Sequence, residues 1–332
     1  MVRGMIAVVC AGAFVMVVAR PADATELGVD GSLLTLDGQP AFLLGVSYYA
    51  GLARTPELMA HDLDDLRERG INWIRVWATW DWHEAQPAVD ATGAAAEPAM
   101  QALRDLVRLA DERDIVVDVT LHRGGVLTSR EAHLAAVRTI ARELLPWRNV
   151  YIDVANERDV RDKRYVSPEE CGELAAAIRE IDPERLVTAS HGGGGLSSEL
   201  VALDLQVATV DFLTPHLPRA ADDPAKTQER VEHLRAWTRE AGRLTPVHLQ
   251  EPFRRDYGAW QPEAEDFLTD LRGAIAGGAA GWCLHNGSNR RSDDGEPRRS
   301  FDLNPERGPF IDTLDDVERA VLDGMAGVEV AQ

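Results

Sequence analysis

Two glutamates, Glu157 and Glu251, carry the clearest chemical signal in the sequence. Each directly follows an apolar run, VYIDVAN for the first and PVHLQ for the second. A pair of opposed carboxyl groups is what hydrolysis of a glycosidic bond requires. One protonates the departing oxygen and the other meets the oxocarbenium-like carbon. The first question is therefore whether the fold brings these two side chains face to face.

The sequence alternates short β-rich runs with helical patterns. Most of the runs are too continuously apolar for a sheet with one wet face, so they fit parallel strands buried on both sides. The starts of successive runs lie 25 to 44 residues apart, which matches βαβ units. The expected strands are residues 42–47, 71–77, 115–121, 150–155, 186–190, 211–215, 246–250 and 279–284. The expected helices are residues 57–70, 97–113, 129–145, 167–181, 196–203, 226–241, 262–276 and 312–325.

Eight such units predict an α/β fold of the (β/α)8 TIM-barrel type, in a single domain. The rival architecture, a doubly wound open sheet, normally places G-x-G-x-x-G after its first strand. Here the first strand ends in GVSYY. We therefore expect one catalytic barrel over residues 41–325 and a C-terminal tail over 326–332. Turn signals at Asp30-Gly31 and Asp37-Gly38 predict a short β-hairpin cap over residues 25–40.

In a barrel of this kind, the active site lies at the C-terminal ends of the strands. Glu157 and Glu251 follow the fourth and seventh strands, so they should face each other across the mouth. Arg75, at the end of the second strand, could hold Glu251 ionised. Burial opposite Glu251 should raise the pKa of Glu157 toward that of a general acid.

Six strings at these strand ends carry a family resemblance: IRVW, VTLH, VYIDVANE, TPH, HLQE and GWCLHN. They resemble the strand-end motifs of glycoside hydrolase clan A, and most of all family 5, which contains cellulases and mannanases. The resemblance implies Glu157 as acid/base and Glu251 as nucleophile. For substrate binding it implies Asn156 at the sugar 2-hydroxyl, Arg75 beside the nucleophile, His122 and His216 lining the reactive subsite, and Trp282 as its floor. It also implies a cis peptide bond after Trp282.

The sequence departs from the family pattern at two places. Arg158 follows the Asn-Glu pair, where the family commonly has proline. The string His216-Leu217-Pro218 stands where the family commonly has His-x-Tyr. A hydroxyl that holds the nucleophile would then come from Tyr257 or Tyr48, or be absent.

Aromatic residues near the strand ends are candidate sugar platforms. The loop after the second strand contains Trp80 and Trp82, and the loop after Glu251 contains Tyr257 and Trp260. Sugar rings stack on such faces, but tryptophans are equally ordinary as partly buried packing residues. Both interpretations stay open for each tryptophan.

Composition limits the partners and the location of the protein. The 332 residues include 55 acidic and 35 basic side chains, a net charge of −20, which disfavours nucleic acid and anionic membranes as partners. Arg3, an apolar run over 5–19 and Ala22-Asp23-Ala24 predict a signal peptide over residues 1–24. We expect a secreted or periplasmic protein with no membrane contact after cleavage. We also expect a monomer. Because no H-E-x-x-H or paired C-x-x-C occurs, we expect no metal, and the proposed chemistry needs no cofactor.

These observations lead to one hypothesis and two rivals. The hypothesis is a retaining glycoside hydrolase that cleaves a β-linked polysaccharide or oligosaccharide, of the β-glucan or β-mannan type, by double displacement. One rival is an exo-acting glycosidase of another clan A family. The other is a catalytically inactive, carbohydrate-binding barrel.

Overall fold

The computed structural model describes residues 24–80, 86–193, 196–253, 260–285 and 308–328, and the backbone of 288–289 and 298–299. Trp82, Tyr257 and nearly all of the expected signal peptide lie outside these residues. Among the helices of the described ranges, none has the length and apolar character that crossing a membrane requires.

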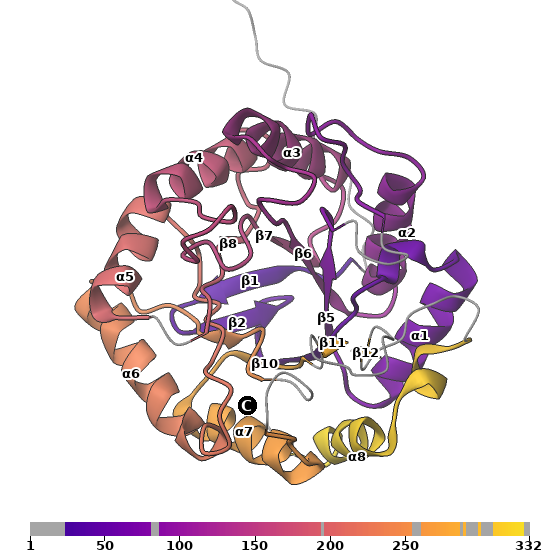
Figure 1. The fold of residues 1–332 in the computed structure, drawn as a ribbon, viewed down its shortest axis with the longest axis vertical. Helices are drawn as coiled ribbons and strands as arrows, with labels where there is room; N and C mark the ends of the chain where they lie inside the picture. Colours follow the sequence, from indigo (N-terminus) through magenta and orange to yellow (C-terminus); the bar gives the residue numbers. More distant parts are fainter. Residues whose placement is uncertain are drawn as a thin grey trace, which may run out of the picture.

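Parallel strands at the centre of the molecule form a (β/α)8 barrel, as the sequence predicts (Figure 1). Seven strands pair in the order β8-β7-β6-β5-β4-β10-β9. They are β4 (Leu43–Ser47), β5 (Trp73–Trp77), β6 (Val116–Thr120), β7 (Val150–Asp153), β8 (Val187–Thr188), β9 (His248–Leu249) and β10 (Gly281–Leu284).

The remaining position of the barrel, between β8 and β9, is filled by residues 211–216. This segment makes isolated parallel bridges, with His191↔Pro215 on one side and Leu213↔Val247 and His216↔Glu251 on the other. Its backbone joins both neighbours, since His216 N–H donates to the carbonyl of His191 and Leu217 N–H to that of Glu251. All eight predicted strand positions are therefore present, and the barrel closes.

Helices surround the strands (Figure 1). They are α1 (Pro56–Glu68), α2 (Ala99–Asp111), α3 (Arg130–Glu143), α4 (Pro168–Arg179), α5 (Ser198–Leu203), α6 (Thr227–Glu240), α7 (Ala264–Gly277) and α8 (Asp316–Met325). Their starts follow the sequence signals: Ser167 caps α4 by accepting from the N–H of Glu170, and Pro168 occupies the first turn. All eight predicted helices are confirmed within a few residues at each end.

A small antiparallel sheet precedes the barrel, comprising β1 (Leu27–Asp30), β2 (Leu33–Leu36) and β3 (Gln39–Ala41). The predicted hairpin is thus present and carries a third strand. Leu27 and Leu34 are buried in one cluster with Trp73, Tyr151 and Phe212, which point into the barrel. This apolar cluster closes the end of the barrel opposite the active site.

Polar side chains take over inside the barrel towards the C-terminal ends of the strands. The indole N–H of Trp73 donates to the Tyr151 hydroxyl, which donates to Asp118. Gly45 lies opposite this indole, and a Cβ there would lie only 1.9 Å from the Trp73 carbonyl oxygen. Asp118 is thus a buried acid between the apolar layer and Arg75, with which it pairs.

Candidate active site

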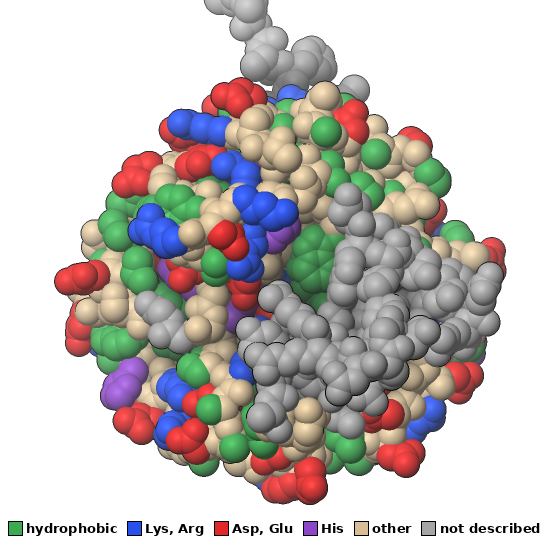
Figure 2. Space-filling model, viewed as in Figure 1, with side chains coloured by type: hydrophobic (Ala, Val, Ile, Leu, Met, Phe, Trp, Pro, Cys, Tyr) green, Lys and Arg blue, Asp and Glu red, His purple; other side chains and the backbone are tan. Residues whose placement is uncertain are grey.

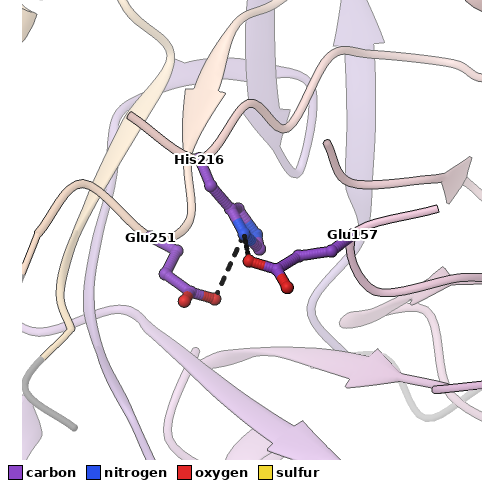
Figure 3. Close-up of side chains that lie close together, drawn as sticks. All are labelled: Glu157, His216 and Glu251. Carbon is purple, nitrogen blue, oxygen red and sulfur yellow. Dashed lines mark hydrogen bonds and ion pairs between the residues drawn. The ribbon is translucent and has the colours of Figure 1, made fainter. Parts of the chain in front are cut away.

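The structure brings Glu157, His216 and Glu251 together at the barrel mouth (Figure 3). Nδ1 of His216 lies 3.4 Å from Oε1 of Glu157 and 3.3 Å from Oε2 of Glu251. The three groups offer ligand atoms that all lie within 4.8 Å of one another. The two carboxyl groups therefore face each other, as the strand-end argument predicts.

Glu251 is buried and held by several donors. Nη1 of Arg75 donates to its Oε2 at 3.0 Å, and Nη2 of Arg219 donates to its Oε1 at 2.5 Å. Nε2 of His285 lies 3.0 Å from the same Oε1. Burial acts to raise the pKa of Glu251, but the charges of His216, His285 and Arg219 outweigh it, and the pKa is held well below its ordinary value. Glu251 is ionised at neutral pH.

Arg75 connects Glu251 to the polar layer inside the barrel. This side chain is fully buried and forms ion pairs with Asp118 and Asp153 as well as with Glu251. Its Nη2 also donates to Oδ1 of Asn156 at 2.7 Å, which fixes the Asn156 amide next to Glu157. Burial raises the pKa of Asp118 to about 8, because the charge of Arg75 only partly offsets the lost hydration.

Glu157 has a different environment. It adopts a left-handed backbone with φ 50°, and its N–H donates to Oγ of Ser190 at 3.1 Å. Its Oε2 accepts from Arg164, which also donates two hydrogen bonds to the carboxylate of Asp162. Burial acts to raise the pKa of Glu157, but His216 and Arg164 outweigh burial and the charge of Glu251, so the pKa is lowered. The expectation of a raised pKa is wrong, because the sequence argument did not include these two cationic partners.

The first departure from the family pattern has a structural explanation. Arg158 is buried and donates to Asp204, the first residue of a π-helical turn over residues 204–208. Nε2 of His191 contacts the other oxygen of Asp204 at 2.5 Å, and the N–H of Gly192 donates to Asp159. This network anchors Arg158 and Asp159, the two residues that follow the left-handed backbone at Glu157.

An aromatic wall lies beside the carboxyl pair. Tyr49 and Trp77 stack with ring centroids 4.7 Å apart, and the half-buried Trp80 stacks on Trp77 at 4.4 Å. The hydroxyl of Tyr49 lies 3.0 Å from Nδ1 of His285. Figure 2 shows basic, acidic and histidine side chains gathered to the left of the centre of this face, next to a recessed hydrophobic surface.

Three buried nitrogens at the mouth have no hydrogen-bond partner among the described residues. They are Trp77 Nε1, His122 Nδ1 and His216 Nε2. Burial, together with the charge of Arg164, lowers the pKa of His122 to about 4, so this imidazole is neutral at neutral pH. Buried polar atoms are normally satisfied, so these nitrogens are candidates to bind hydroxyl groups of a ligand.

Two of the predicted substrate contacts are wrong. Trp282 is fully buried and points to the helical layer, where its indole N–H donates to Asp270 of α7 at 2.6 Å. Tyr48 also points outward, and its hydroxyl donates to Asp62 of α1 at 2.5 Å. Successive strand residues alternate between the two faces of the barrel wall. Tyr48 and Trp282 each neighbour an inward-facing residue and therefore point outward, towards the helices.

The expected cis peptide bond after Trp282 is also wrong. Among the described residues, the cis peptide is at Glu97-Pro98. The 282–283 bond lies inside β10, which pairs in register with β4 through Trp282↔Leu44 and Cys283↔Gly45. Trp260 is half-buried, with its ring 5.2 Å from that of Phe253, and its role as a sugar platform stays a prediction.

The sequence assigned no role to Tyr49, His285, Arg164 or Arg219, which also belong to the site. The alternation of strand residues could have found two of them, since Tyr49 follows the inward-facing Ser47 by two positions and His285 follows the inward-facing Cys283 by two. No period identifies Arg164 or Arg219, because both lie on irregular loops. Arg219 directly follows Pro218, the position where the family commonly has tyrosine, and donates to Glu251.

The group of Glu157, His216 and Glu251 also has the spacing of a three-ligand metal site. However, Arg164 donates to a carboxylate oxygen of Glu157, and Arg75 and Arg219 donate to the two oxygens of Glu251. A cation bound here would face three guanidinium groups at close range. The donor set therefore suits carboxylate chemistry better than metal binding.

Comparison with known proteins agrees with the barrel fold. Residues 36–250 match the family profile described as Cellulase (glycosyl hydrolase family 5). A glycoside hydrolase family 5 mannosidase from Rhizomucor miehei superposes with a TM-score of 0.64 at 15% identity, covering 92% of this chain and 97% of that chain. An endo-1,4-beta-D-mannanase from Thermotoga petrophila gives 0.62 at 16% identity, covering 86% and 99%. No curated protein matches the chain in sequence. At these identities the solved structures show the shared barrel fold.

Proposed function

Because this chain belongs to glycosyl hydrolase family 5, we propose that it cleaves a β-linked polysaccharide or oligosaccharide, of the β-mannan or β-glucan type, with retention of anomeric configuration. The observation that carries the proposal is the facing pair of Glu157 and Glu251, with ligand atoms within 4.8 Å. Retaining enzymes have carboxyl groups about 5–5.5 Å apart, whereas inverting ones need roughly 6.5–9.5 Å to admit a water. The close approach of one oxygen from each carboxyl group leaves little room for such a water, which favours retention.

Glu251 acts as the nucleophile. Its pKa is held well below the ordinary value, so the carboxylate is available to attack the anomeric carbon. Glu157, in its protonated form, gives its proton to the departing glycosidic oxygen. In the second step Glu157 takes a proton from water, the water oxygen bonds to the anomeric carbon, and Glu251 leaves as a carboxylate.

The remaining groups at the mouth bind the sugar. Asn156, fixed by Arg75, can hydrogen-bond the 2-hydroxyl, and the three unpartnered nitrogens of Trp77, His122 and His216 can serve other ring hydroxyls. The half-buried Trp80 offers an apolar face for a neighbouring sugar ring. Export of the chain after cleavage of residues 1–24, and a monomeric state, belong to the same proposal.

A reducing-sugar assay of the purified protein over β-mannan, β-glucan, xylan and galactan tests this function. Two solved structures with a similar fold are a mannosidase and a mannanase, so β-mannan is the first substrate to try. We expect activity on mannan or glucan that the double variant Glu157→Ala/Glu251→Ala lacks, and proton NMR of the first product should show the β anomer. An α product would contradict retention. Binding of a polysaccharide without any hydrolysis would favour the inactive carbohydrate-binding barrel.

A further inference from the structure

Arg219 occupies an unusual position next to Glu251. It follows the segment 211–216, which closes the barrel, and Leu217 N–H donates to the carbonyl of Glu251 itself. The N–H of Ala220 donates to Asp223 at 2.5 Å, which turns the chain immediately after Arg219. The Arg219 side chain is about nine-tenths buried and reaches Oε1 of Glu251 at 2.5 Å. The loop is thus fixed on both sides of the arginine.

Arg219 and Arg75 bind different oxygens of the same carboxylate. Arg75 contacts Oε2 and shares its charge with Asp118 and Asp153 in the buried layer below. Arg219 contacts Oε1. The charge of Arg75 is therefore shared among three carboxyl groups, whereas Arg219 adds a second cation directly against the reacting group.

The charge of Glu251 changes during the proposed reaction. The free enzyme has a carboxylate, the glycosyl-enzyme has a neutral ester, and the second step restores the carboxylate. In that second step the bond between the anomeric carbon and the Glu251 oxygen breaks, and its electron pair stays on Glu251. The attacking water gives its proton to Glu157. A fixed cation next to Oε1 stabilises the charge that develops as Glu251 leaves.

We propose that Arg219 is a catalytic residue of the second step, which accelerates hydrolysis of the glycosyl-enzyme by stabilising Glu251 as the leaving carboxylate. This inference rests on the proposed retaining function. The proposal gives Arg219 a role that a neutral hydroxyl donor at the same place could not have. A hydroxyl can orient Glu251, whereas a guanidinium also favours its ionised form over the ester, and so speeds departure of Glu251 more than its attack.

Kinetics with a dinitrophenyl β-mannoside or β-glucoside test the proposal. The leaving group needs no proton, so the first step is fast and kcat reports the second step, while kcat/KM reports the first. Arg219→Met should lower kcat about 10- to 100-fold, the range expected for a lost hydrogen bond to a charged group. We expect kcat/KM to change less than about threefold, and KM to fall with kcat. Mass spectrometry of the quenched variant should find a sugar attached to the peptide that contains Glu251.

Two further variants make the result specific. Arg219→Lys keeps the cation and should recover most of the lost kcat. Arg138→Met removes an arginine of α3 that pairs with Glu180 rather than with Glu251, and it should leave both constants unchanged. If Arg219→Met does not fold, Arg219→Gln offers the same loss of charge with hydrogen bonding retained.

The proposal is overturned if kcat and kcat/KM fall together, or if the lysine variant is as slow as the methionine variant. Either result would make Arg219 a residue that only positions Glu251. Failure of the proposed function gives a different result: the wild-type protein would hydrolyse the aryl glycoside with inversion, or would not hydrolyse it at all.

Discussion

The two carboxyl groups at the barrel mouth are held in different ways. Glu251 follows a strand of only two residues, yet two arginines and two histidines surround its carboxylate, and it is buried. Glu157 follows a four-residue strand, but it lies on a left-handed turn, and its arginine comes from an irregular loop.

The difference fits two distinct chemical roles. A nucleophile must be ionised and fixed before the substrate arrives, so dense charge pairing around Glu251 is an advantage. An acid/base group must gain and lose a proton in each cycle, so it needs fewer permanent partners. The comparison predicts that changes on the Glu251 side will have larger effects than changes on the Glu157 side.

The largest effect is expected for Glu251→Ala. This change removes the atom that forms the glycosyl-enzyme, so hydrolysis should fall by more than the roughly 10²–10⁴-fold that proton transfer contributes, for every leaving group. Added azide could occupy the vacated space and give a glycosyl azide of inverted configuration, which proton NMR identifies. An azide product of retained configuration would show that Glu251 is not the nucleophile.

Glu157→Ala should be less damaging and should depend on the leaving group. It removes proton transfer, so activity on polysaccharide should fall about 10²–10⁴-fold. A dinitrophenyl glycoside needs no acid and should still form the glycosyl-enzyme at a useful rate. Azide should then rescue turnover with retention, the opposite outcome to Glu251→Ala. Full polysaccharide activity in this variant would remove Glu157 from the mechanism.

Arg164→Gln should change the pH dependence more than the maximal rate. Glu157 must be protonated to act as an acid, so its pKa sets the basic limb of kcat/KM. His216 and Arg164 lower that pKa, and removing Arg164 should raise it. The basic limb should therefore move to higher pH, while the rate at each protein's own optimum changes less than about tenfold, because the acid itself remains. Arg130→Gln is a suitable control, since Arg130 pairs with Glu173 on the outer helices. A basic limb that does not move would break the assigned link between Arg164 and Glu157.

Sequence reasoning recovered the barrel and the reacting pair, because both depend on strong regularities. Short apolar strands at βαβ spacing determine the fold, and strand ends determine where Glu157 and Glu251 lie. Arg164 and Arg219 were missed because an irregular loop has no period from which a side-chain direction follows. The pKa of Glu157 was predicted in the wrong direction because the sequence argument did not include His216 and Arg164 as its cationic partners.

Errors of one residue at the strand ends have a simpler origin. Adjacent strand residues point to opposite faces, so one step in sequence separates the active site from the helical layer. Trp282 and Tyr48 were placed on the inner face, whereas His285 and Tyr49 occupy it. Here the fold was correct and the register of two strand ends was not.

The neighbouring tyrosines offer the finest test of this register, with the smallest expected effects. Tyr49→Phe keeps the stack on Trp77 but removes the hydroxyl next to His285, which contacts Glu251. We expect kcat/KM to fall less than about tenfold, with thermal stability almost unchanged. Tyr48→Phe removes a buried hydrogen bond to Asp62 on the outer face, and should cost about 1–3 kcal/mol of stability while kcat/KM stays constant. Thermal melts and aryl glycoside kinetics on both variants measure the two effects. If Tyr48→Phe loses activity and Tyr49→Phe loses stability, the inward and outward assignments at this strand end are reversed.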